Sequence, residues 1–151
     1  MKTGTVMTWQ KNNQLLNSLL IQMCRSFLQY VSESSPWVRI EAASVGREVE
    51  VLAARQRQDV AAIAQLLDSR ECFVDFGSFP TEYTDLQFIA LNSMTAGLVR
   101  SQKCNCESLS RGLQTVQASS DAEATALLTD VLAHEQDLLK ALEELPTANA
   151  G

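Results

Sequence analysis

One carboxylate interrupts an otherwise apolar series near the C-terminus. The series recurs at alternating spacings of four and three, and comprises Ala124, Leu128, Val131, Glu135, Leu138, Leu142 and Leu145. This alternation is typical of one buried helix face. Glu135 is therefore expected to point into a core, where an unpaired carboxylate would be strongly unfavourable. Its chemistry is then either a buried hydrogen bond or ion pair, or metal binding.

A second polar interruption lies in the middle of an earlier helical pattern. Continuing the apolar stripe past Leu52 places Gln56 and Asp59 on or beside the inward face. Gln56 and the neighbouring Arg55 and Arg57 are the expected partners of a buried Glu135. Facing carboxylates at mid-helix are also how four-helix bundles hold two metal ions. Gln56, Asp59 and Glu135 are thus candidates for one shared site.

His134 is the single histidine of the chain. It lies about 100° around the helix from Glu135, which directs it towards a neighbouring helix or solvent rather than the same cavity. The favoured interpretation is a structural or surface histidine. The alternative is a metal site made by Glu135, Asp59 and His134, holding iron or manganese.

Four cysteines, Cys24, Cys72, Cys104 and Cys106, are expected to be reduced thiols in a chain of this size. Redox and zinc sites use Cys-x-x-Cys spacing, whereas residues 104 and 106 on a helix point about 200° apart. Cys72 is predicted to be the most reactive. A thiol-based redox protein using Cys72 or the 104/106 pair is a further alternative.

The composition disfavours several classes of function. The formal net charge is −6 and the basic residues are scattered, so neither nucleic acid nor an anionic membrane is an expected partner. The start of the chain does not resemble a signal peptide, and no apolar run approaches the roughly 20 residues that span a bilayer. Phosphate-loop, hydrolase-elbow and His-Glu-x-x-His motifs are missing from the sequence. We expect a cytoplasmic protein.

Apolar periodicity predicts one domain of four helices, over about residues 12–33, 42–68, 82–117 and 121–145. Residues 1–11 and 146–151 are predicted to be a flexible N-terminus and a flexible tail. Thr81 is the expected N-cap of the third helix, and Ser120 with Glu123 forms a capping box for the fourth. Gly97 indicates a close helix contact or a kink. Trp37 and Val38 are expected to plug one end of the bundle.

The connection between the second and third helices is long and apolar. Residues 70–80 include Phe73, Val74, Phe76 and Phe79, too many apolar side chains for a solvated loop. About a dozen extended residues at roughly 3.3 Å each can run the length of a 27-residue helix at about 1.5 Å per residue. We therefore predict an all-α, antiparallel four-helix bundle with a long crossover between helices two and three.

In its helix lengths, its crossover and its carboxylate at the middle of the last helix, the chain resembles the ferritin-like superfamily. That resemblance implies a Glu on the first and third helices and Glu-x-x-His on the second and fourth. Here Glu135 is followed by Leu138 where the His belongs, and Gln56 and Asp59 stand where the other Glu-x-x-His would lie. Helix one offers Met23 and Gln22, and helix three offers Thr95 and Gln102.

The leading hypothesis is a divergent, non-catalytic ferritin-like bundle with no cofactor, acting as an interaction or structural module. Leu15, Leu20 and Ile21 lie beside the apolar stripe of the first helix and suggest a homodimer or another protein partner. A divergent metal-binding oxidase is the alternative, and the thiol-based redox protein is the second.

Overall fold

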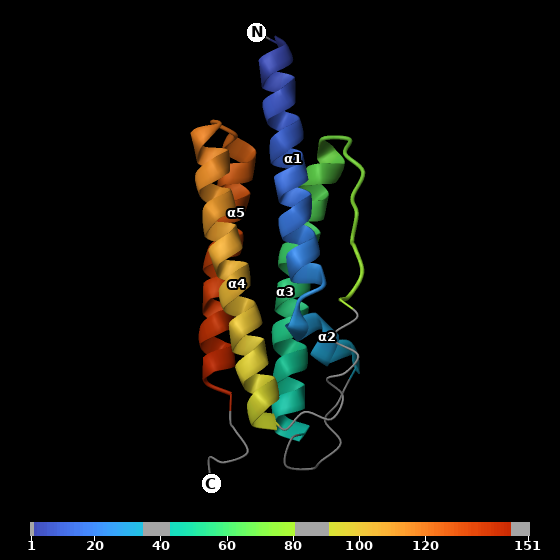
Figure 1. Ribbon diagram of the computed structural model, residues 1–151, viewed down its shortest axis with the longest axis vertical. Coiled ribbons are helices and arrows are strands. Elements are labelled where there is room, and N and C mark those ends of the chain that lie inside the picture. The colour runs from blue at the N-terminus through green and yellow to red at the C-terminus, as the bar shows by residue number, and fades with distance from the viewer. Residues whose placement is uncertain (1, 35–42, 81–90, 146–151) are drawn as a thin grey trace.

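The computed structural model describes residues 2–34, 43–80 and 91–145. These residues form five α-helices and no strand, so the all-α prediction is confirmed for them (Figure 1). The helices are α1 (Lys2–Cys24), α2 (Phe27–Ser34), α3 (Ala43–Ser69), α4 (Leu91–Ala118) and α5 (Ala122–Glu143). Within the described ranges, no helix has both the length and the apolar character needed to cross a membrane.

The long helices form a bundle. α1 packs against α3 and α4, α5 packs against the same two helices, and the short α2 continues beyond α1 and also contacts both. In Figure 1, α1 and α5 run down the page, while α3 and α4 run up it.

The predicted second and fourth helices agree with the structure, whereas the first begins earlier than predicted and is interrupted at Arg25 and Ser26. The predicted start of the third helix lies outside the described residues. α3 and α5 lie within two residues of the predicted ranges. Residues 1–11 were predicted to be flexible, yet α1 already begins at Lys2. The Arg70 guanidinium stacks 4.0 Å above the Trp9 ring, and Asn12 donates to Ser119 and Asp121. Apolar periodicity could not predict these polar contacts, which help to stabilise the N-terminal part of α1. The expectations for Thr81 and for Trp37 and Val38 lie outside the described residues.

The start of α5 differs from the predicted capping box. Its N-cap is Asp121 rather than Ser120, and the Asp121 carboxylate accepts from the Ala124 N–H. Ser120 has a positive φ of 59°. It belongs to the end of α4, because its N–H bonds to Gln117 O and the Asp121 N–H bonds to Val116 O. This is a Schellman motif with Ser120 at the left-handed position.

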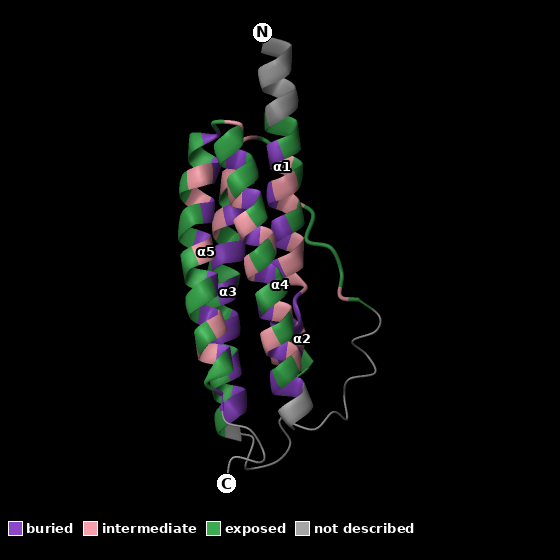
Figure 2. Cartoon of the chain, turned by 60° about the vertical axis from the view of Figure 1, so that its left-hand side comes forward, coloured by how far each residue is buried: buried purple, intermediate pink, exposed green. Residues whose placement is uncertain are grey.

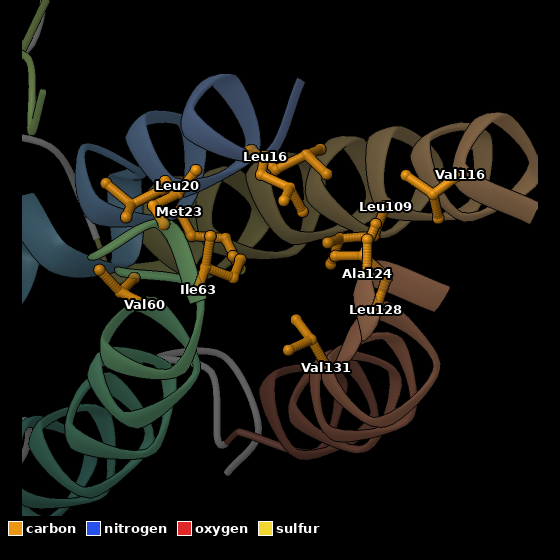
Figure 3. Packing of buried hydrophobic residues seen from close by; sticks show 12 residues of the cluster. Leu16, Leu20, Met23, Val60, Ile63, Leu109, Val116, Ala124, Leu128 and Val131 are labelled. Carbon is orange, nitrogen blue, oxygen red and sulfur yellow. The ribbon is translucent and has the colours of Figure 1, made fainter. Parts of the chain in front are cut away.

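Two hydrophobic clusters fill the bundle, one on each side of its middle. Figure 2 shows buried positions alternating with exposed ones along the long helices. Figure 3 shows the first cluster, in which side chains of α1, α3, α4 and α5 converge, among them Leu20, Ile63 and Leu128. The second lies at the α2 end and includes Phe27, Leu52 and Leu138. Gly97 permits the predicted close contact there, since a Cβ at this position would lie 2.9 Å from Phe27 Cε2. Every apolar residue of the series that runs from Ala124 to Leu145 is buried.

Residues 70–80 run beside α1. Asn17 holds the Asp75 backbone through two hydrogen bonds, one to its carbonyl at 3.0 Å and one from its N–H at 2.9 Å. Arg25 Nε donates to Phe76 O at 3.0 Å, and Ile21 lies so close to Gly77 that a Cβ there would be 2.8 Å from it. The described part of this connection therefore covers one side of α1. Its continuation over 81–90 lies outside the described residues.

The apolar residues beside the stripe of the first helix were expected to form a dimer contact, but they pack inside the bundle. Leu20 is fully buried, and Leu15 and Ile21 pack on the first hydrophobic cluster. The apolar residues of 70–80 were expected to lie against the bundle. Val74 does so by packing on the first hydrophobic cluster, and Phe79 does so by lying against Tyr30. Phe73 is instead 91% exposed.

Candidate functional site

A layer of buried polar side chains separates the two hydrophobic clusters, and we call it the polar layer. Its members come from the α1–α2 junction, α3, α4 and α5, and they are Ser26, Gln29, Gln56, Asp59, Gln102, Asn105 and Glu135. None is more than 5% exposed. Buried polar groups at one level of four chain segments must satisfy one another, because water is excluded there.

The junction between α1 and α2 brings two side chains into this layer. The helix is interrupted at Arg25 and Ser26, and the Phe27 N–H bonds to Ser101 Oγ of α4 at 3.3 Å. Ser26 Oγ accepts weakly from the Gln29 N–H, in the manner of an N-cap, and donates to Gln56 at 2.8 Å. The interruption thus turns Ser26 and Gln29 towards α3.

Gln56 and Gln102 hold Glu135 from two sides. Gln56 Nε2 donates to Glu135 Oε1 at 2.8 Å and to Gln102 Oε1 at 3.2 Å. Gln102 Nε2 donates to the same Oε1 at 3.1 Å and to the Glu135 carbonyl at 2.9 Å. Asn105 completes this side of the network by donating to Gln102 Oε1 at 3.3 Å.

The other amide groups of the network are also used. Gln56 Oε1 accepts from Gln29 Nε2 at 3.0 Å as well as from Ser26. Gln29 Nε2 also donates to Ala53 O at 2.9 Å, and Gln29 Oε1 accepts from Arg57 Nη1 at 3.0 Å. Each glutamine therefore both donates and accepts, which defines the orientation of its amide.

Glu135 has a different environment at its second oxygen. The side chain is fully buried, and Glu135 Oε2 has no hydrogen-bond donor among the described residues. Burial, together with a hydrogen bond to the Asp59 carboxyl group, raises the pKa of Glu135 from 4.5 to about 8, although the bonds from Gln56 and Gln102 oppose this. With a pKa of about 8, Glu135 is mainly protonated at pH 7, and its interaction with Asp59 is one cause of this shift.

Asp59 links this acid to the surface. Its Oδ1 lies 2.8 Å from His134 Nδ1, while the His134 side chain is 62% exposed. The hydrogen bond that His134 donates to the Asp59 carboxylate raises the pKa of His134 above its ordinary value, despite the opposing effect of desolvation. The outward direction predicted for His134 is confirmed. Only the metal alternative placed His134 together with Asp59, and their hydrogen bond depends on the α3–α5 register.

The cysteines do not converge on this layer as a group. All four are free, as predicted. Burial, followed by the charge of Glu135, raises the pKa of Cys106 to about 11, which leaves a neutral and weakly nucleophilic thiol. Cys104 is exposed on the same helix. Cys72 lies far along the chain from both, where its Sγ accepts from Asn13 Nδ2 at 3.0 Å.

Cys72 lines a groove of about 630 Å³ between α1 and the first residues after α3. Amide side chains of α1, such as Asn13 and Asn17, form one wall, and Phe73 and Asp75 contribute to the other. Phe76 nearby in the chain is 45% exposed, and Trp9 on α1 is 38% exposed. We call this groove, with Phe73 at its edge, the α1 groove.

The polar layer does not fit a metal ion. Within the described ranges, no group of three or more His, Cys, Asp or Glu side chains could hold one. Two amide N–H groups already point at Glu135 Oε1, and a cation there would face their positive hydrogens. Leu138 is packed in the second hydrophobic cluster, so it supplies no ligand one turn after Glu135. Glu135, Asp59 and His134 do lie next to one another, as the metal alternative required, but they are held by hydrogen bonds.

Comparison with known proteins gives no family to which this arrangement can be assigned: no family model, curated protein or solved structure matches the chain.

The sequence predicts the residues at the centre of the polar layer but not those at its edges. Glu135, Gln56 and Asp59 were all predicted to face inward, and they meet. Asn105 could have been found from the series Leu98, Gln102, Asn105, Leu109, which continues the spacings of four and three along α4. No pattern indicates Ser26 and Gln29, because the helix is interrupted between them and the preceding stripe.

Proposed function

We propose that this chain is a divergent ferritin-like bundle that is non-catalytic and works as an interaction or structural module, associating first with a second copy of itself. The observation that carries the proposal is the hydrogen-bonded polar layer. At the level where a ferritin-like protein would hold its metals, glutamine amides and a protonated acid use each other's hydrogen-bonding groups.

The arrangement of the chain supports the ferritin-like part of the proposal. α3 and α4 run in the same direction in Figure 1 and each contacts α1 and α5, and residues 70–80 run beside α1. This is the geometry expected of a bundle with one long crossover. Four free thiols fit the reducing cytoplasm that we propose as its location.

The α1 groove supports the interaction part. Phe73 is 91% exposed beside a concave surface, and large exposed apolar groups next to a groove are common at protein interfaces. A second copy of the chain is the simplest partner, because most oligomers of soluble proteins are symmetric homo-oligomers.

Sedimentation velocity from about 1 μM to about 1 mM tests self-association, since this range spans weak to moderate dimer affinities. We expect a dimer that dissociates on dilution, and we expect Phe73→Ser to shift the equilibrium towards monomer at least about tenfold. Val51→Ser is the matched control, because Val51 is 55% exposed on α3 and does not line the groove. A wild-type protein that stays monomeric at the highest concentration would remove the homodimer from the proposal.

A further inference from the structure

We propose that Glu135, Asp59 and His134 form a proton-linked switch in the middle of the bundle, in which one proton between two buried carboxyl groups keeps the polar layer closed and His134 exposes that pair to the pH of the solvent.

The burial of the two acids favours a proton between them. Glu135 is 0% exposed and Asp59 is 5% exposed. The first oxygen of Glu135 accepts from two amides, and the second has no donor among the described residues. Asp59 acts on Glu135 through a side-chain hydrogen bond and through its charge. Two ionised carboxylates there would repel each other without water to screen them. A proton on Glu135 would remove one charge and allow a hydrogen bond between the two side chains.

The protonation state of His134 determines the net charge of the three side chains. When its imidazole is protonated, the ring balances the Asp59 carboxylate at 2.8 Å, and the three side chains carry no net charge as long as Glu135 is neutral. At higher pH the imidazole and Glu135 both lose their protons, which leaves two negative charges in the layer. In the part of the chain that the structure describes, no Lys or Arg forms a salt bridge with Glu135 or Asp59, and Arg57 contacts the layer through Gln29.

The surrounding groups do not replace this pair. From α4, Cys106 is near enough for the charge of Glu135 to act on it, and its thiol stays neutral because burial raises its pKa to about 11. The charge of the exposed Glu107 adds to this effect. From α5, Asp130 adds to the effect that holds a proton on His134. The α1–α2 side contributes the neutral side chains of Ser26 and Gln29.

The consequence for folding has a definite sign. The pKa of Glu135 is about 8 in the folded chain and ordinarily 4.5. Between these values the folded state keeps a proton that the unfolded state has lost, so the free energy of unfolding falls as pH rises across this window. The contribution of Glu135 to the free energy of unfolding is therefore lowest above about pH 8.

The direct test is a carbon-13 NMR titration of the full chain with labelled glutamate and histidine, between about pH 4 and pH 10. We expect the Glu135 carboxyl signal to titrate near pH 8. Asp59→Asn should lower that midpoint by at least about one pH unit and return the His134 midpoint towards 6.5. A purely structural Asp59 would leave both midpoints unchanged.

Glu135→Gln provides a second measurement if Asp59→Asn does not fold. Glutamine has the shape of the protonated acid and cannot ionise. The urea midpoint of the wild type should fall between about pH 5 and pH 8, and that fall should be largely absent in Glu135→Gln. A Glu135 carboxyl that titrates near 4.5, or equal pH dependence in the two proteins, would overturn the proposal.

Discussion

Two buried amide groups depend on Glu135 Oε1 as an acceptor, one from Gln56 and one from Gln102. This dependence makes the shape of residue 135 more important than its charge. A neutral side chain of the same shape should preserve the layer, whereas an apolar side chain of similar size should leave buried N–H groups with fewer partners.

We therefore predict different effects for two substitutions at this position. Glu135→Gln should fold normally at pH 7, because its Oε1 can accept from the same amides and its Nε2–H can donate to Asp59. Glu135→Leu should be less stable than Glu135→Gln by roughly 1–3 kcal/mol, the range for a buried donor that loses its acceptor. Urea denaturation of both variants gives the difference. An equally stable or more stable Leu variant would show that the amides find other acceptors.

At this scale the inward positions of Glu135, Gln56 and Asp59 could be predicted, because helical periodicity directly gives the face on which a residue lies. Their hydrogen-bond partners could not be. The choice of Gln56 rather than Arg55 or Arg57 as the partner of Glu135 depends on the axial register of α3 and α5, and periodicity within one helix carries no information about that register.

The helix ends show how backbone geometry links separate elements. α3 and α4 both end in Schellman motifs, and the left-handed position of each is occupied by a residue other than glycine, Glu71 at φ 57° and Ser120 at φ 59°. The residue after Ser120 is Asp121, which both completes the α4 motif and caps α5. Arg70 at 2.6 Å from Asp121 joins the end of α3 to the same point.

Glycine at the left-handed position should relieve this strain. Ser120→Gly is predicted to stabilise the protein by roughly 0.5–1 kcal/mol, because a Cβ disfavours positive φ. Gln117→Gly, three residues earlier in the exposed face of α4, is the matched control and should destabilise it by about 1 kcal/mol. Thermal unfolding of the two variants beside the wild type measures both effects. Destabilisation by both substitutions would mean that Ser120 makes a contribution beyond its backbone conformation.

The predicted capping box at Ser120 illustrates what sequence leaves open at the element scale. Ser120 and Asp121 both have side chains that cap helices, and Glu123 suits a box with the former. The tight α4–α5 connection decides between them, since it places Ser120 in the left-handed region and leaves Asp121 in the extended conformation of an N-cap. The interruption of α1 at Ser26 is similar, because a contact with Ser101 of another helix replaces the local hydrogen bond.

Across the whole molecule, the bundle consists of two apolar clusters with the polar layer between them. The apolar clusters follow from periodicity, and the number of long helical segments was accordingly predictable. The layer gives the bundle a defined register, because sliding one helix along another would separate Gln56 and Gln102 from Glu135. We infer that the polar residues of this layer act as hydrogen-bonding partners for each other rather than as metal ligands.

Metal content tests that claim most directly. The chain should be purified without a histidine tag from cells supplied with iron and manganese, in the wild-type form and as Glu135→Gln, and analysed for bound elements. We predict far less than one metal ion per chain in both proteins, since amide hydrogens face Glu135 Oε1 and Glu135 keeps its proton at neutral pH. Near-stoichiometric iron or manganese that is present in the wild type and lost in Glu135→Gln would contradict the account and favour a metal-dependent oxidase.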